Sequence, residues 1–289
     1  MLVDSTALLR RMTEADLDAA YGLSAEQKWP HRPEDWAMLQ ALGQGYVIED
    51  DGKVVGTAMS WPFGETAATV GMVIVSPACQ GRGLGRALMD ALLGDLGGRT
   101  VMLNATAEGE PLYRKIGFVE TGVILQHQGV PNAVPVIEML PGERVRPMGS
   151  KDLPLLRDLS RAATGMDRDA VTDAILADGQ CVILTRDNAP VGFAIFRRFG
   201  RGYLIGPTIA PDAHGARVLI NHWLAANASS FCRLDITEES GLGPWLAELG
   251  LPQVGRVVKM VCGAPLPPAP PLPSAQRVQL FSLVSQALG

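Results

Sequence analysis

A glycine-rich stretch stands directly before a sequence with the apolar spacing of a helix. Residues 80–86 read QGRGLGR, and residues 84–96 carry leucine and alanine on one stripe. The first backbone N–H groups of a helix have no carbonyl partner within it, so with the helix dipole they bind anions such as phosphate or pyrophosphate. Glycine lacks the side chain that would keep a phosphate away, and Arg82 and Arg86 can add charge. The stretch therefore predicts an anion site at a helix start.

Glycine-rich stretches before helices occur in several structural contexts. An ordinary strand-to-helix connection also uses glycine, and on these residues alone it stays an open alternative. The Lys-Ser/Thr ending of a P-loop is absent, and the GxGxxG spacing of a dinucleotide site is not met.

The chain contains an internal repeat. Residues 10–24 (RRMTEADLDAAYGLS) are similar to residues 146–160 (RPMGSKDLPLLRDLS), and three later blocks recur in the same order. The offset between the copies stays near 135 positions; Gly56, for example, pairs with Gly192. Two unrelated domains with similar hairpins are the alternative, but a constant offset over four blocks favours a duplication. We therefore expect a duplicated domain.

Each copy is predicted to run strand, helical region, three strands, helix, strand, helix and strand. This order indicates a mixed α/β (α+β) fold, with a central sheet flanked by helices in each of two tandem domains. We place the first domain at residues 1–142 and the second at 143–263. Residues 264–289 would form a Pro-rich linker and a C-terminal strand.

Composition excludes several classes of protein. The chain has 289 residues, a net charge of −5 and a pI near 5.4, which is not typical of a nucleic-acid binder. The four cysteines lack the spacing of a zinc site or a disulfide framework, so we expect reduced thiols and no metal. No signal peptide or apolar segment of membrane-spanning length is present. We expect a cytoplasmic protein without a membrane partner, either a monomer or a homodimer.

Two motifs at the expected separation resemble the GNAT superfamily of acyl-CoA-dependent N-acetyltransferases. Its Q/R-x-x-G-x-G/A signature is matched by Gln80 and by residues 82–85, and its L-Y-x-x-x-G-F signature by residues 112–118. The resemblance covers roughly residues 8–140. The tandem arrangement resembles a subgroup in which a divergent GNAT-like domain follows the first.

The resemblance implies acetyl-CoA as cosubstrate. In the strand at residues 70–75, residues 73–75 would lie along the pantetheine arm, and a backbone N–H near Val73 would polarise the thioester carbonyl. The alternative is that these valines are simply sheet core. The cofactor-binding residues implied are Val73, Ile74, Val75, Gln80, Gly81, Arg82, Gly83, Leu84, Gly85, Arg86 and Asn104.

The resemblance also gives Tyr113 a catalytic role. Its hydroxyl would lie near the CoA sulfur and protonate the departing thiolate. The alternative is an aromatic side chain that packs on the inner face of its helix.

The general base and the acceptor pocket are less defined. Residues 70–75 carry no carboxylate, so the base candidates are Glu65, Glu108, His31 or a chain of water molecules. Position between the first two helices and beside the sheet suggests an acceptor pocket, although ordinary core is the alternative. The pocket candidates are Trp29, His31, Trp36, Trp61 and Phe63.

The second copy lacks both the glycine-rich loop and the tyrosine of the first copy. Its loop keeps one glycine, and Leu246 stands opposite Tyr113, so we expect no productive binding of acetyl-CoA there. The copy would wall the acceptor site or stabilise the first domain. Residues 133–140 (AVPVIEML) are predicted as the last strand of the first copy. The second copy lacks such a strand in the expected place, and residues 276–284 are predicted to supply it.

The function predicted is acetyl transfer from acetyl-CoA to a primary amine of a small molecule. Two alternatives stay open: a catalytically weak acyl-CoA-binding or sensing module, and a protein N-acetyltransferase.

Overall fold

The computed structural model describes residues 7–132, 134–269, 272 and 277–289. The first repeat forms β1 (Ala7–Arg11), α1 (Leu17–Glu26), α2 (Pro33–Leu42), β2 (Gln44–Asp50), β3 (Lys53–Phe63), β4 (Ala67–Val75), α3 (Leu84–Leu96), β5 (Thr100–Ala105), α4 (Glu110–Lys115) and β6 (Val119–Gly129). The second forms β7 (Glu143–Pro147), α5 (Leu153–Thr164), α6 (Asp169–Ala177), β8 (Gln180–Arg186), β9 (Ala189–Phe199), β10 (Gly202–Ala210), α7 (Ala213–Ala226), β11 (Cys232–Thr237), α8 (Gly243–Glu248) and β12 (Gln253–Cys262). The tail adds β13 (Gln279–Ser282). The predicted mixed α/β class and element order are confirmed.

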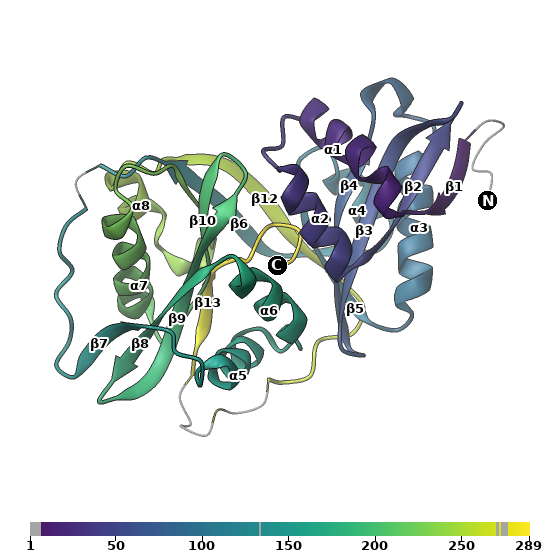
Figure 1. Ribbon diagram of the computed structural model, residues 1–289. Coiled ribbons are helices and arrows are strands. Elements are labelled where there is room, and N and C mark those ends of the chain that lie inside the picture. Colours follow the sequence, from purple (N-terminus) through teal and green to yellow (C-terminus); the bar gives the residue numbers. More distant parts are fainter. Residues whose placement is uncertain (1–6, 133, 270–271, 273–276) are drawn as a thin grey trace.

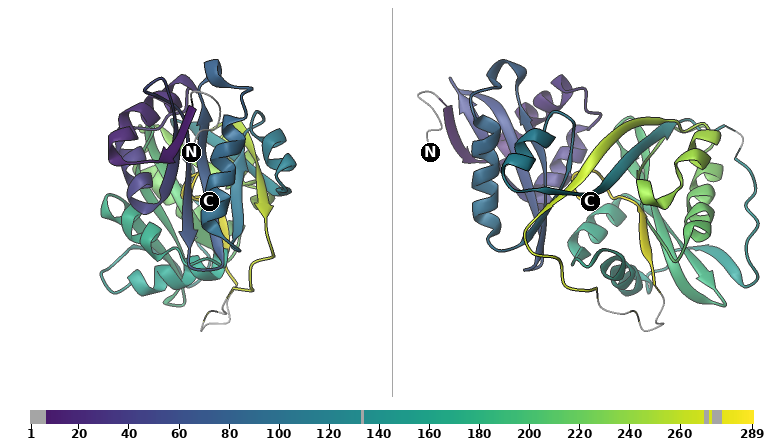
Figure 2. Two further views of the ribbon diagram at one scale, coloured as in Figure 1. Left: turned by 90° about the vertical axis from the view of Figure 1, so that its right-hand side faces the viewer. Right: turned by 180° about the vertical axis from the view of Figure 1, so that it is seen from behind.

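Helices cover both faces of the sheet in the first repeat. Figure 2 shows α1 and α2 on one face and α3 on the other. Within the described residues, no helix is long and apolar enough to span a membrane. The largest apolar cluster contains Trp36 and Met59 of the first repeat together with Leu156 and Phe193 of the second, so the two repeats share a core.

The two repeats exchange strands at the centre of one 13-stranded sheet (Figure 1). The strand order is β1-β2-β3-β4-β5-β12-β6-β11-β13-β10-β9-β8-β7. Strand β12 of the second repeat pairs antiparallel with β5 and β6, and β6 of the first repeat pairs antiparallel with β11. One continuous sheet therefore contains strands of both predicted domains, residues 1–142 and residues 143–263.

The prediction of a strand at residues 133–140 is wrong for the residues that the structure describes. Residue 133 lies outside the described part, and residues 134–140 form no strand but cross the second repeat to β7. Both edges of β6 are already paired, with β12 and β11, so a further strand has no edge to join. Pro135 also lacks a backbone donor. Its carbonyl accepts a hydrogen bond from Asn221 Nδ2 at 3.0 Å.

Each repeat has one pair of parallel strands that diverge. Strands β4 and β5 pair only from Ala67–Thr69 to Thr100–Met102 and then separate. Strands β10 and β11 pair only at Tyr203 and Leu204. In the second repeat the gap is filled by β13, which pairs antiparallel with both β10 and β11. The tail thus joins the sheet of the second repeat; residue 276, the first of the predicted strand, lies outside the described part.

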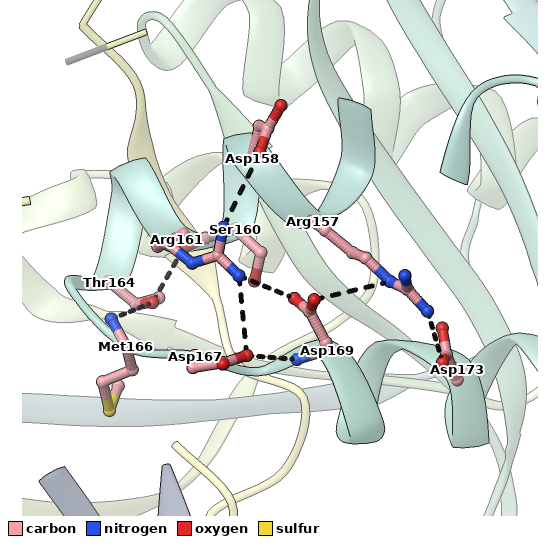
Figure 3. A network of polar contacts seen from close by, with 9 residues as sticks. All are labelled: Arg157, Asp158, Ser160, Arg161, Thr164, Met166, Asp167, Asp169 and Asp173. Carbon is pink, nitrogen blue, oxygen red and sulfur yellow. Dashed lines mark hydrogen bonds and ion pairs between the residues drawn. The ribbon is translucent and has the colours of Figure 1, made fainter. Parts of the chain in front are cut away.

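A polar network connects α5 to α6 (Figure 3). Arg161 forms ion pairs with Asp158, Asp167 and Asp169, and Arg157 reaches Asp169 and Asp173. Single exposed ion pairs contribute little to stability, but several shared ones fix the local geometry of the turn before α6.

The turn before α6 anchors the end of the tail. Arg168, between Asp167 and Asp169 of the network, turns inward and is buried. Its Nη2 donates to the carbonyl oxygens of Leu288 and Gly289 at 2.7 and 2.6 Å. The tail therefore passes from the sheet of the second repeat to the interface with the first.

Candidate active site

The start of α3 has the geometry of an open anion site. The helix begins at Leu84 after Gly83, which adopts a left-handed backbone with φ of 80° that favours glycine. No side chain caps this end, so the first N–H groups of the helix point toward solvent without a carboxylate in front of them. A Cβ atom at Gly83 would meet no protein atom within 4 Å, so the space above the loop is free for a ligand.

The two loop arginines already have acidic partners. Arg82 pairs with Asp50, and Arg86 Nε donates to Asp90 at 2.8 Å. Gln80 donates from Nε2 to the carbonyl oxygen of Val75 at 3.2 Å, which connects the loop to the end of β4. The loop's attraction for an anion therefore comes mainly from backbone groups rather than from free guanidinium charge.

The gap between β4 and β5 widens into a cleft of about 410 Å³ that ends at the loop. It is lined by every residue of the predicted cofactor set except Arg82, and also by Tyr113 and Glu108. Glu65, the other carboxylate named as a candidate base, is exposed and lines neither this cleft nor the cavity next to it.

A β-bulge in β4 lies at the wall of this cleft. Met72 adopts a positive φ of 53°, and the pairing of β3 with β4 shifts register beside it. The Thr57 hydroxyl donates to the Met72 carbonyl oxygen at 2.8 Å and holds the bulge. A bulge redirects backbone groups out of the regular ladder, which is useful where a strand must contact a ligand. In the sequence only the adjacent Gly71 indicates irregular backbone, so the bulge could not be predicted from it.

Tyr113 lines the cleft from α4. It is 7% exposed, and burial raises the pKa of its phenol to about 12. The hydroxyl therefore keeps its proton at neutral pH, and it makes no hydrogen bond within the described part of the chain. The ring packs against Phe118 with centroids 6.0 Å apart. Its environment allows both packing and proton donation.

A second cavity of about 210 Å³ continues from the cleft toward the second repeat. The two share Trp29, Gly71, Met72, Asn104 and Thr106 as walls. The far side of the second cavity is built by residues of β9, β11 and β12, so both repeats enclose it.

His31 lies in this second cavity beside aromatic rings. Its ring stands edge-on to Phe199 at 5.6 Å, and Nδ1 is buried without a partner in the described structure. Burial, followed by the charges of Arg233 and Arg197, lowers the pKa of His31 to about 4. The imidazole is therefore neutral near pH 7 and can accept a hydrogen bond.

The other three pocket candidates lie in the core. Trp36, Trp61 and Phe63 are each at most 3% exposed and line neither cavity. Trp36 Nε1 donates to the Ser24 hydroxyl at 3.0 Å, and Trp61 Nε1 donates to the Leu39 carbonyl oxygen at 2.9 Å. Buried indoles need such partners, and these satisfy them within the protein. From the sequence alone, an aromatic side chain that lines a cavity could not be distinguished from one that packs in the core.

The tail closes one side of the second cavity, which the sequence did not indicate. Asn104 Nδ2 donates to the Gln286 carbonyl oxygen at 2.8 Å. Ala287 lies so close to Gly71 that a Cβ atom there would come within 3.1 Å of the Ala287 Cα atom. The tail thus touches both diverging strands of the first repeat.

The equivalent positions of the second repeat are closed. Asp212 caps α7, and its carboxylate accepts from the Gly215 N–H at 2.8 Å and from Arg186. Leu246, opposite Tyr113 in the alignment of the copies, is fully buried. The gap between β10 and β11 is occupied by β13, which pairs with both strands.

Together, the fold and the cleft define a class: a mixed α/β protein with an open helix start at the point where two parallel strands diverge. Family models described as acetyltransferase (GNAT) domains match residues 41–120 and 156–271, which together span more than half of the chain. The chain belongs to the GNAT acetyltransferase family, with two such domains in tandem.

Three similar proteins match this chain over most of its length. The uncharacterized N-acetyltransferase YitH of Bacillus subtilis is 26% identical over 97% of this chain and 98% of its own length. A putative acetyltransferase from Pyrococcus horikoshii superposes with a TM-score of 0.77 at 20% identity, over 100% of this chain and 98% of that one. A tandem GNAT protein from the clavulanic acid biosynthesis pathway gives a TM-score of 0.66 at 16% identity, over 89% and 98%. The two structures support the fold.

Proposed function

We propose that this protein is an acetyl-CoA-dependent N-acetyltransferase that transfers the acetyl group directly to a primary amine of a small molecule. The observation that carries the proposal is the adjacency of the two cavities. The cleft at the open start of α3 and the second cavity, which is lined by both repeats, share Met72 and four other residues as walls.

The cleft residues supply the parts that direct transfer needs. Backbone N–H groups at the start of α3 would bind the pyrophosphate, and the diverging β4 would hydrogen-bond the pantetheine arm. A backbone N–H at the bulge beside Val73 would polarise the thioester carbonyl. The neutral amine attacks that carbonyl carbon and the C–S bond breaks, and Tyr113 would give its proton to the leaving thiolate. The proton lost by the amine nitrogen goes to water, and water returns a proton to Tyr113.

A second candidate function is a weak acyl-CoA-binding or sensing module. It is favoured by the lack of any carboxylate on β4 and by the exposure of Glu108, the one carboxylate among the cleft-lining residues. The enclosure of the second cavity, in contrast, favours a small acceptor over a protein tail.

Calorimetry and a thiol assay separate these functions. We expect one acetyl-CoA per chain, and steady release of free CoA thiol when the correct amine is added. Binding without release across a broad amine panel would favour the sensing module. Absence of acetyl-CoA binding would refute both.

A further inference from the structure

The second cavity has an uneven charge. Among its lining residues are two arginines, Arg233 of β11 and Arg256 of β12, and neither aspartate nor glutamate. Asp235, which pairs with Arg233, is fully buried and does not line the cavity. An acceptor amine arrives at neutral pH as an ammonium ion, so a cationic wall is unexpected unless another part of the acceptor is negative.

Arg233 is held in one orientation, and one nitrogen of its guanidinium makes no hydrogen bond within the described residues. Nε and Nη2 both donate to the Asp235 carboxylate, at 3.0 Å in the closest contacts. The guanidinium lies over the Phe199 ring, 5.4 Å from its centroid. Nη1 forms no hydrogen bond within the described part of the chain. A fixed guanidinium with a spare donor is suited to bind an oxyanion without further ordering.

Arg256 supplies a second and unneutralised charge. It is exposed on β12, and the described residues give it no ion pair or side-chain hydrogen bond. Gly255 and Val257, its neighbours on the strand, also line the cavity.

The positive charge of this cavity also affects how the acceptor amine loses its proton. Positive groups near an amine favour its neutral form and lower its pKa. His31 experiences this field, since burial and the charge of Arg233 lower its pKa, against the opposing charge of Asp35 and with a smaller contribution from Arg197. An acceptor amine in this cavity would lose its proton more easily than in water, without a carboxylate on β4.

We propose that the acceptor is a small amine that also carries an oxyanion, a carboxylate or a phosphate, and that Arg233 and Arg256 bind this group. The amine then lies near Met72 and Asn104, at the wall shared with the cofactor cleft. This inference deepens the proposed function and rests on it for the identity of the reaction. Substrate selection would then depend on the second repeat, although the cofactor binds the first.

Binding of simple anions tests the site without any turnover. Chain saturated with CoA, whose own phosphates occupy the α3 loop, is titrated with glutarate and with inorganic phosphate. We expect one further anion site per chain, with affinity reduced about tenfold or more in Arg256→Gln, the loss of a charge-assisted hydrogen bond. Arg144→Gln, at an exposed arginine of β7, is the matched control and should bind normally. No anion binding, or equal binding in both variants, would overturn the inference.

Turnover then identifies the oxyanion. Matched acceptors are butylamine, 1,4-diaminobutane, 4-aminobutyrate and 3-aminopropyl phosphate. We expect one of the two anionic amines to be favoured about tenfold or more in kcat/KM, and Arg256→Gln to remove that preference while the KM for acetyl-CoA stays unchanged. Equal or better use of butylamine or 1,4-diaminobutane, which carry no anionic group, contradicts the inference but leaves the proposed function intact. Failure of every amine counts against the proposed function, and the anion titration still judges the site.

Discussion

The start of α3 and the start of α7 occupy equivalent places in the two repeats, yet only one is open. At α3 the residue before the helix is a left-handed glycine with no capping side chain. At α7 it is Asp212, whose own carboxylate takes the place that a phosphate would have. A protein-borne anion stabilises a helix start permanently, whereas an uncapped one is available to a ligand.

The two pairs of diverging strands differ in the same way, since one gap is open and the other is filled. The gap between β4 and β5 is a cleft, and the gap between β10 and β11 holds β13. The comparison shows how one ancestral arrangement serves two purposes. Where polar backbone groups are left unpaired they can bind a cofactor, and where the chain pairs them itself they stabilise the fold.

The largest expected effect comes from a substitution in β13, the strand that fills the gap between β10 and β11. Phe281 of β13 is 4% exposed in the core of the second repeat. Phe281→Ala should lower the free energy of unfolding by about 3–5 kcal/mol, because it leaves a cavity. Denaturant unfolding measures this, with Gln279→Ala, an exposed change on the same strand, as control. Equal stability of the two variants would mean that β13 does not fill the gap tightly.

The next effect concerns the open loop. Gly83→Val should weaken acetyl-CoA binding about 100-fold, since a branched side chain strains a left-handed position and projects toward the phosphate site. Gly52→Val is a matched control: its φ is 74°, and it too has open space around its Cβ, in the turn between β2 and β3. Calorimetry compares the two. Similar affinity in both folded variants would remove the loop from the cofactor site.

Tyr113→Phe tests the residue that Leu246 replaces in the second repeat. Turnover should fall about tenfold or more while acetyl-CoA affinity changes little, because only the proton donor is removed. With a folded pKa of about 12, raised from 10, the phenol stays protonated, so its ionisation causes no decline in rate below pH 10. Above that pH the unfolded chain loses this proton first, and stability declines.

The control for this prediction is Tyr46→Phe, whose hydroxyl bonds to Asp95 outside the cleft. It should keep full turnover. If both variants behave as the parent, Tyr113 is a packing residue.

The smallest effect concerns the closed helix start. Asp212→Ala removes the cap of α7 and should lower the free energy of unfolding by about 1 kcal/mol. Asp212→Asn, which keeps a capping side chain, should lose less. Neither variant should bind a second acetyl-CoA, because β13 still fills the gap behind α7. A second binding site in Asp212→Ala would show that the cap alone closes the second repeat.

The sequence by itself determined the features that depend on local chemistry. Glycines before a helical stripe predicted a helix start without bulky side chains in front of it, and the constant offset between the copies indicated the duplication. Tyr113 and Leu246 could be compared because each lies at a fixed distance from a matched glycine. Strand and helix periodicity likewise indicated the order of elements, since both reflect which side of a segment is buried.

Only the tertiary structure decided which strands pair and which side chains line a cavity. The exchange of β6 and β12 was not readable, because an apolar strand can join any compatible edge and its pattern does not name the partner. The bulge at Met72 arises from pairing with β3, and the burial of Trp36 and Trp61 depends on distant segments. Arg233 and Arg256 meet in one cavity with His31 only because the second repeat folds against the first.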